Sequence, residues 1–357
     1  MTVMAQVLIN QSNILQTKLT SCPTAPLSSG QVRCALQRFA LTANNVTYAA
    51  TGSVLGYWAF FPSQQKEQGI LPVWGFAEVI ESRAADVPVG TRYYGFFPMA
   101  DQVVMTPKVG AQGGITDVSA HRAELPIIYN QYVQTRTTNP QADSLRALLQ
   151  PLLATSYLLA DWLTENQFFN ANQVVIGSAS SKTGLGLAKF LAAQPEKSVQ
   201  IVGLTSAANS GFVEGLGIYD HVLTYDAVEQ LAQVPSVYVD MAGHAGVKQR
   251  LHTHLADVLR HSCAVGTSHW DKFQPKQDLA GPKPQFFFAP DQMVKRRKDW
   301  GPDVIERQIR DAWKGIAAQA ETWLDVKTHD GLEAALPVYD SLARGQANPR
   351  DGHVIVL

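Results

Sequence analysis

The chain has 357 residues, of which 46% are hydrophobic and 17% charged, so it is long enough for about two domains and is not disordered. Its 29 Lys and Arg residues balance 30 Asp and Glu residues to a formal net charge of -1, which argues against nucleic acid or an anionic membrane as a partner. No run reaches the roughly 18 apolar residues of a membrane span, and the N-terminus shows no secretory signal. We therefore expect a cytoplasmic protein. Cys22, Cys34 and Cys263 are too few and too scattered for a disulfide framework or a thiolate-rich zinc site.

The first part of the chain, up to about residue 130, predicts a β-rich region. Short β-branched and aromatic runs alternate there with Gly, Pro and Asn turns, which is typical of strands. The runs expected to be strands are 32–41, 45–50, 72–82, 91–97 and 101–107.

From about Asp143 apolar residues recur at helical spacing, and Pro151 is expected to end or kink this helix. Apolar strands then alternate with helices, which is typical of a parallel sheet covered on both faces. This region predicts strands at 172–180, 199–206, 220–226 and 236–243, and helices at 183–194, 210–217 and 247–259. Beyond it we expect strands at 263–268 and 284–290, helices at 304–324 and 331–346, and a last strand at 352–357 that returns to the first domain without a parallel partner.

The most informative motif follows the strand that ends at Gly177 and opens the next helix. A turn of small residues at this place lets backbone N–H groups and the helix N-terminus face a pyrophosphate. The strict GxGxxG pattern is absent, and so is the GxxxxGK[ST] pattern, because Ser precedes Lys where Gly is required. The residues alone leave a dinucleotide site and a merely tight turn equally open. The turn consists of Ser178, Ala179, Ser180, Ser181, Lys182, Thr183 and Gly184.

The order of these regions resembles the medium-chain dehydrogenase/reductase superfamily. Residues 175–192 are similar to the cofactor turn of its zinc-free quinone-reductase and enoyl-reductase branches, with Ala179 and Gly184 matching and Ser181 and Lys182 departing from its glycines. Segments 88–95, 220–225, 240–244 and 352–357 resemble the superfamily in the same order. The resemblance implies an α/β protein of a divergent branch. Its GroES-like β-rich domain would span 1–142 and 322–357, and a Rossmann domain with a doubly wound parallel sheet would span 143–321.

The same resemblance implies a nicotinamide cofactor on the turn and at Gly243. NADP is favoured over NAD, because Thr205 and Ser206 end the second Rossmann strand with hydroxyl groups and the first carboxylate after them is Glu214. Tyr225 matches a tyrosine that reaches the same phosphate in NADPH-using relatives.

The positive charge for that phosphate has no obvious source. The relatives supply a Lys where this chain has Asn209, so we expect Lys182 to lie beside the cofactor phosphates. The alternative for Lys182 is a solvated loop side chain.

Zinc is not expected, because residues 73–78 lack the Gly-His-Glu motif of the zinc-dependent relatives. Negative charge that develops on the substrate must then meet hydrogen-bond donors. Tyr48 is similar in position to a tyrosine near the nicotinamide, and its phenol stays protonated at neutral pH. Asn45 would orient Tyr48 or bind ribose, and Tyr57 is a second candidate donor. The alternative is that Tyr48 is simply a packed strand residue.

We therefore expect a zinc-free NADPH-dependent reductase that moves hydride onto an activated C=C or C=O bond of an enone, quinone or ketone. Two alternatives stay open, a non-catalytic NADP-binding sensor or scaffold and a cleft between the domains for another ligand. Aromatic residues 56–61 either wall such a cleft or belong to a core. The run 286–288 indicates a sheet edge that pairs in a homodimer, and the basic run 295–298 indicates a solvated face or a site for an anionic substrate tail.

Overall fold

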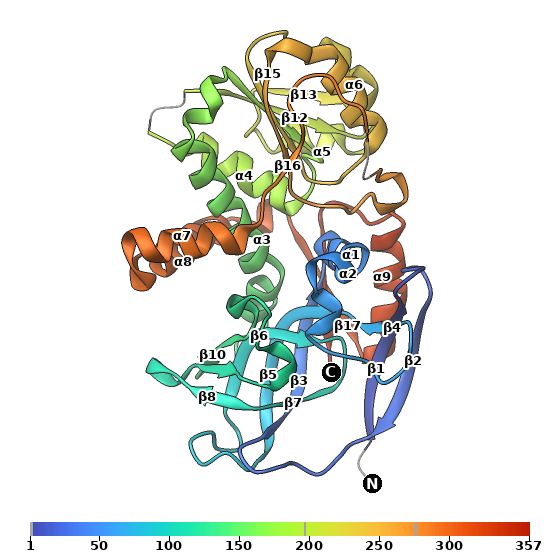
Figure 1. Ribbon diagram of the computed structural model, residues 1–357, viewed down its shortest axis with the longest axis vertical. Coiled ribbons are helices and arrows are strands. Elements are labelled where there is room, and N and C mark those ends of the chain that lie inside the picture. The colour runs from blue at the N-terminus through green and yellow to red at the C-terminus, as the bar shows by residue number, and fades with distance from the viewer. Residues whose placement is uncertain (1–2, 196–197, 275–276) are drawn as a thin grey trace. The chain divides into compact units, whose positions relative to one another are not determined.

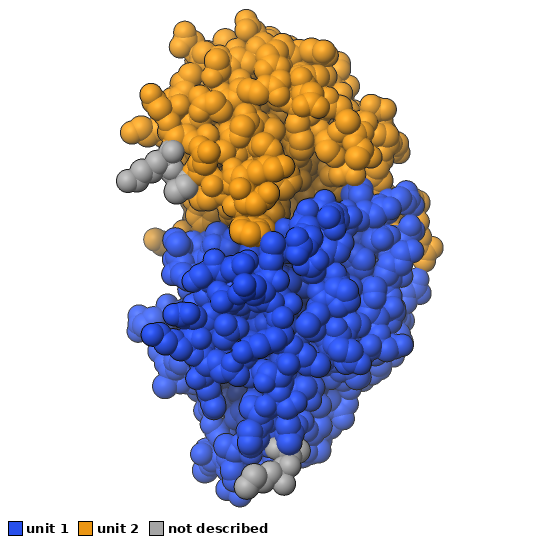
Figure 2. Space-filling view, turned by 90° about the vertical axis from the view of Figure 1, so that its right-hand side faces the viewer, with its two compact units in different colours: residues 1–148, 325–357 blue, residues 149–324 orange. Residues whose placement is uncertain are grey.

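The computed structural model describes residues 3–195, 198–274 and 277–357. The chain divides into two compact units, which Figure 2 shows in blue and orange. Unit 1 comprises residues 1–148 and 325–357, and unit 2 comprises residues 149–324. Helix α3 (Pro140–Glu165) contributes residues to both units.

Unit 1 is β-rich, and its described residues form a nine-stranded and a three-stranded sheet. The larger sheet has the order β17-β18-β3-β5-β6-β10-β9-β8, with β7 also paired to β3, and the smaller one has the order β2-β1-β4 (Figure 1). The strands are β1 (Val3–Asn10), β2 (Thr17–Pro23), β3 (Val32–Leu41), β4 (Gln68–Ile70), β5 (Pro72–Ser82), β6 (Arg92–Pro98), β7 (Gln102–Met105), β8 (Pro107–Val109), β9 (Ile115–Asp117), β10 (Gln131–Thr135), β17 (Asp325–Asp330) and β18 (Asp351–Val356).

The last strand confirms that the chain returns to the first unit, but its pairing differs from the expectation. Strand β18 pairs antiparallel with β3 and parallel with β17. Strand β17 was not expected, because charged and polar residues dominate its segment. Most of its side chains are exposed. Such a composition is common in an edge strand, where charge opposes pairing with another chain.

The strand expected at 45–50 is wrong, because this segment lies in helix α1 (Ala43–Ala50). The helix begins with a capping box, in which Thr42 and Asn45 satisfy each other's backbone N–H groups. Its buried residues recur at helical spacing instead of alternating: they are Asn45, Val46, Tyr48 and Ala49. The short helices α2 (Gly52–Leu55) and η1 (Tyr57–Ala59) follow.

Unit 2 is built on a six-stranded parallel sheet of the described residues, in the order β13-β12-β11-β14-β15-β16. This is the doubly wound Rossmann order. Successive strands are added on one side of β11 up to β13 and then on its other side from β14 onward, and ligands bind at this point outside the carboxyl ends of the strands. The strands are β11 (Gln173–Gly177), β12 (Gln200–Thr205), β13 (His221–Thr224), β14 (Ser236–Asp240), β15 (Leu259–Ala264) and β16 (Gln285–Phe286). The helices outside α1–α3 are α4 (Lys182–Ala192), α5 (Ser210–Gly215), α6 (Ala245–Leu255), α7 (Ala289–Trp300), α8 (Pro302–Ala317) and, in unit 1, α9 (Ala335–Ala343).

Of the two effects expected of Pro151, an end of the helix is excluded, because α3 continues to Glu165 with the apolar side chains on both sides of the proline buried. Two further expectations in this region need correction. The strand expected at 263–268 is β15, which begins earlier, and only two residues of 284–290 form strand β16. No helix in the described part of the chain is long and apolar enough to cross a membrane.

Candidate functional site

The predicted cofactor turn connects β11 to α4 through a tightly bonded backbone. Ser178 has a positive φ of 54°, a conformation that favours glycine. The N–H of Ala179 donates to the carbonyl of Leu204 on β12 at 2.9 Å, and the N–H of Ser181 donates to that of Ser178 at 2.9 Å. The hydroxyl of Ser181 then caps α4 by accepting from the N–H of Gly184 at 3.1 Å. The turn therefore keeps a left-handed step without glycine and presents the N-terminus of an eleven-residue helix.

The carboxyl end of β12 brings hydroxyl groups next to this turn. Thr205 is fully buried, and its Oγ1 has no hydrogen-bond partner among the described residues. A buried hydroxyl without a partner is uncommon in folded proteins. Ser206 follows it as the cap of a short helical turn. The side chain of Asn209 donates to Ser180 Oγ at 3.2 Å, so the residue at the position of the relatives' lysine bonds to the turn itself.

Tyr225 lies directly after β13 and reaches the same turn. Its hydroxyl interacts with Ser178, and burial together with the nearby Asp240 carboxylate raises the pKa of Tyr225 to about 12. The hydroxyl is therefore a protonated hydrogen-bond donor throughout the physiological range. The ring centroids of His244 and His269 lie 6.3 and 6.4 Å from that of Tyr225.

The segment after β14 forms a second turn at this edge of the sheet. One carboxylate oxygen of Asp240 accepts from the N–H of Gly243 at 2.8 Å and from that of Ala242 at 3.2 Å. Gly243 has a positive φ of 77°, and His244 caps α6 through Nδ1. No role was predicted for His244 and His269. Both residues follow the carboxyl ends of parallel strands, and this position was the sequence feature that could have indicated them.

A cluster of aromatic residues surrounds the predicted proton donor in unit 1. Tyr48 is buried on α1, and its ring centroid lies 4.4 Å from that of Tyr57, which is buried as well. The indole Nε1 of Trp74 on β5 donates to the Tyr48 hydroxyl at 3.3 Å, and the hydroxyls of Tyr57 and Tyr129 are 3.4 Å apart. Burial raises the pKa of all three tyrosines. Tyr48 is thus a helical residue and not a strand residue, and it is packed in unit 1 with its hydroxyl in a polar contact.

Both the oxygen and the nitrogen of the Asn45 side-chain amide form hydrogen bonds with the backbone. Its Oδ1 accepts from the N–H of Thr42 at 2.8 Å, and its Nδ2 donates to the carbonyl of Pro72 at 3.0 Å. Asn45 therefore fixes α1, which carries Tyr48, to the start of β5. Of its two predicted roles, this geometry favours orientation of Tyr48 over contact with ribose.

Further residues of this cluster lie on strands and helices distant in sequence. The Tyr94 hydroxyl is buried without a hydrogen-bond partner in the part of the chain that the structure describes. The guanidinium of Arg146 lies 4.1 Å from the centre of the Tyr94 ring, and burial lowers the pKa of Arg146. No local pattern connects Trp74, Tyr94, Tyr129 and Arg146, so sequence analysis could not assemble them.

Comparison with known proteins identifies the family of this chain. The model of the family described as "Protein of unknown function (DUF2855)" matches residues 39–348. The chain belongs to this family. No curated protein matches it in sequence.

Solved structures are similar to this DUF2855 member over nearly its whole length. CurA from Vibrio vulnificus in complex with NADPH has a TM-score of 0.62 at 14% identity, covering 99% of this chain and 98% of that one. The ETR1P/NADP/crotonyl-CoA complex has a TM-score of 0.58 at 12% identity, and the quinone oxidoreductase from Coxiella burnetii one of 0.56 at 14% identity, each covering 100% of both chains. These similarities confirm the expected fold, a β-rich domain together with a Rossmann-type domain built on a parallel sheet.

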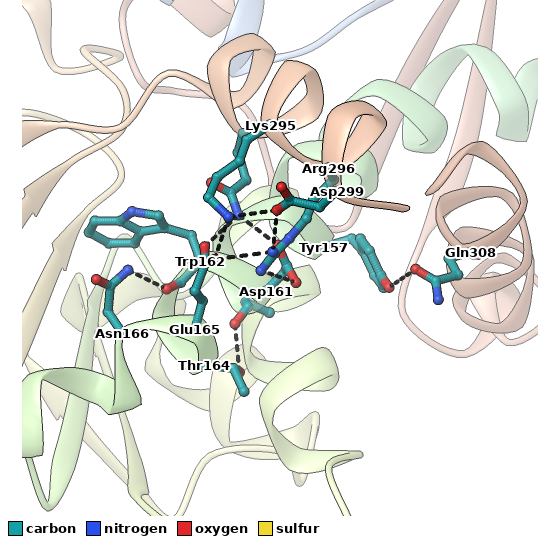
Figure 3. Close-up of polar contacts among 12 residues, drawn as sticks. Tyr157, Asp161, Trp162, Thr164, Glu165, Asn166, Lys295, Arg296, Asp299 and Gln308 are labelled. Atoms are coloured by element: carbon teal, nitrogen blue, oxygen red, sulfur yellow. Dashed lines mark hydrogen bonds and ion pairs between the residues drawn. The ribbon is translucent and has the colours of Figure 1, made fainter. Parts of the chain in front are cut away.

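The basic run of this DUF2855 chain is partly a solvated face and partly paired: Lys295 and Lys298 are exposed, whereas Arg296 is buried in ion pairs. Figure 3 shows Arg296 on α7 with its guanidinium against Asp161 of α3, at 2.7 and 3.0 Å to the two carboxylate oxygens. Lys295 pairs with Glu165 of α3 and with Asp299. These contacts fasten α7 to α3.

No group of three or more His, Cys, Asp and Glu side chains within the described ranges is placed to hold a metal ion. In the stretch where zinc-dependent relatives carry Gly-His-Glu, Glu78 accepts a hydrogen bond from Gln37 Nε2 at 2.9 Å.

Proposed function

We propose that this protein is a zinc-free NADPH-dependent oxidoreductase that transfers hydride to an activated C=C or C=O bond of a small molecule such as an enone, quinone or ketone. The observation that carries the proposal is the edge of the parallel sheet at β11, where a left-handed turn, a helix N-terminus and the hydroxyl groups of Thr205 and Tyr225 meet. The NADPH complex of CurA and the NADP complex of ETR1P, which share the fold, support this choice of cofactor.

The residues at this edge fit such a cofactor. The first turn of α4 offers backbone N–H groups and the positive end of the helix dipole to a pyrophosphate. Ser178 holds the left-handed conformation of the turn although it is not a glycine. Thr205, Ser206 and Tyr225 would hold the 2′-phosphate as hydroxyl donors, and the turn at Gly243 would hold the adenosine.

Bound NADPH would supply the hydride, and the chain's own residues would manage the charge that this hydride leaves on the substrate. The Tyr48 hydroxyl would donate a hydrogen bond and then a proton to the oxygen on which negative charge develops. Burial keeps Tyr48 protonated until that moment, since it raises the pKa of the phenol. Tyr57 remains the second candidate for this role.

We also propose that the protein is cytoplasmic and forms a homodimer that pairs through β16.

The first test is a thermal-shift titration of the purified protein with NADPH and with NADH. A cofactor that binds only the folded state stabilises it by RT ln(1 + [L]/Kd), and we expect a clear shift with NADPH and a small one with NADH. Turnover of enones, quinones and ketones is then measured by loss of NADPH absorbance. No shift with either cofactor would overturn the proposal, and binding without turnover would favour the sensor or scaffold.

Substitution then identifies the donor. We expect Tyr48→Phe to lower kcat by about 100-fold or more, as for loss of a general acid, while the Kd for NADPH is unchanged. Tyr57→Phe is the matched comparison, because it removes a neighbouring hydroxyl from the same cluster. A larger effect in Tyr57→Phe than in Tyr48→Phe would reassign the proton donor to Tyr57.

A further inference from the structure

The hydroxyl of Tyr48 has a hydrogen-bond donor beside it on a different element of the fold. Trp74 donates its indole N–H to that oxygen at 3.3 Å from β5, across a sequence separation of 26 residues. The position of α1 relative to β5 is held independently, because Asn45 donates to the carbonyl of Pro72 two residues before Trp74. The contact between Trp74 and Tyr48 therefore belongs to a built arrangement of two elements.

The direction of this hydrogen bond has a chemical consequence. An indole N–H can only donate, so the Tyr48 oxygen is the acceptor and its own O–H is left for another partner. If the proton leaves, the oxygen becomes negative and the same N–H forms a charge-assisted bond, which is about twice as strong as a neutral one. The rings of Tyr57 and Phe96 lie 4.4 and 5.6 Å from that of Tyr48, and the low dielectric of packed surroundings strengthens a hydrogen bond.

Electrostatics act in the same direction. Burial raises the pKa of Tyr48, whereas the hydrogen bonds from Trp74 and Asn44 lower it. Each of these donors therefore makes the phenol a stronger acid than burial alone would leave it. Trp74 is partly exposed and also contacts Tyr94 and Phe96, with ring centroids 5.8 and 5.1 Å away, so its own orientation is fixed by packing.

We propose that Trp74 is a positioning residue for proton donation by Tyr48: its indole N–H orients the hydroxyl toward the substrate and stabilises the tyrosinate left after transfer. This inference rests on the proposed function. In the step, the O–H bond of Tyr48 breaks, the proton joins the substrate oxygen that gained charge from the hydride of NADPH, and the electron pair stays on the phenolate oxygen. A proton from solvent restores Tyr48 before the next turnover.

The decisive test measures the ionisation of Tyr48 without relying on activity. Tetrafluorotyrosine, whose ring fluorines acidify the phenol so that it titrates while the protein stays folded, is installed at position 48 and its titration is followed by fluorine NMR, in the otherwise unchanged chain and in Trp74→Phe. Loss of a hydrogen bond to the charged form is expected to raise the pKa of this phenol by about one unit, a tenfold change in its ionisation constant. Trp58→Phe is the matched control, because Trp58 is a buried indole of the same unit whose N–H meets no hydrogen-bond acceptor among the described residues; it is expected to leave the titration unchanged.

Turnover provides the second readout. Trp74→Phe is expected to lower kcat about tenfold with an unchanged Kd for NADPH, and to have no further effect in a chain that already carries Tyr48→Phe. Trp74→His retains a ring N–H and is uncharged above neutral pH, so it is expected to recover part of the lost kcat there. An unchanged titration of position 48 in a folded Trp74→Phe protein, with turnover intact, would overturn this inference alone. Absence of turnover in the unsubstituted protein would overturn the proposed function together with it.

Discussion

Removal of a single hydroxyl from Tyr225 tests how the protein would recognise the 2′-phosphate of NADPH. The hydroxyl lies beside Ser178 of the cofactor turn, and with a pKa of about 12 it remains protonated at any pH at which the protein is assayed. It can therefore donate to a phosphate oxygen. A hydrogen bond to a charged group contributes about 1.5–3 kcal/mol, which corresponds to a roughly 10- to 100-fold change in a dissociation constant. We expect Tyr225→Phe to weaken NADPH binding by this factor.

The same substitution should leave NADH binding nearly unchanged, because NADH lacks the phosphate. Dissociation constants for both cofactors are measured by calorimetry at one fixed salt concentration, and the ratio of the two is the quantity that decides. Tyr219→Phe is the control: its hydroxyl donates to the carbonyl of Ala179 in the same turn at 2.8 Å, so its loss should cost about 1 kcal/mol of stability without changing that ratio. If Tyr225→Phe weakens both cofactors equally, or neither, the assigned role of Tyr225 is wrong.

Three predictions concern stability. Gln167 is exposed with a positive φ of 50°, so Gln167→Gly should raise the free energy of unfolding by about 0.5–1 kcal/mol in urea titrations. Asp117 and Arg122 form a fully buried ion pair at 3.2 Å, and Asp117→Asn should cost about 3 kcal/mol by leaving the guanidinium unpaired. Burial lowers the pKa of His269 to about 4, below its value of about 6.5 in the unfolded chain. Unfolding therefore takes up a proton between these values, stability should fall by up to about 2–3 kcal/mol as pH drops through this window, and His269→Gln should flatten that fall.

Strands with strong apolar patterns could be predicted closely from the sequence. The expected strands at 32–41 and 72–82 coincide with β3 and β5, and the alternation after residue 172 correctly indicated the parallel sheet. In these elements burial and local preference act together, because β-branched and aromatic residues fill a sheet that is covered on both faces. Turn residues on either side then define where each strand ends.

The elements that sequence analysis missed depend on contacts between distant residues. Helix α1 contains Val46, Thr47 and Tyr48, which favour strands, yet Asn45 caps it and bonds to the carbonyl of Pro72. Helix α7 shows little apolar periodicity, and its ion pairs to α3 reach back about 130 residues in the sequence. Neither partner is visible in a local window, so local propensity gave the wrong answer for α1 and no answer for α7.

The same distinction separates the two parts of the candidate site. The geometry of the turn after β11 was predictable because β11, the turn and the N-terminus of α4 are contiguous, so one short segment contains all of it. The donor cluster was only half predictable: Tyr48 and Tyr57 stand close together in the sequence, whereas Tyr129 reaches Tyr57 across 72 residues. A candidate proton donor can be named from one segment of sequence. The residues that would change the pKa of that donor lie on other elements, and only the fold brings them next to it. A sequence search for this chemistry should therefore pair the tyrosine segment of α1 with the aromatic residues of β5, and test the pair by substitution before assigning an activity.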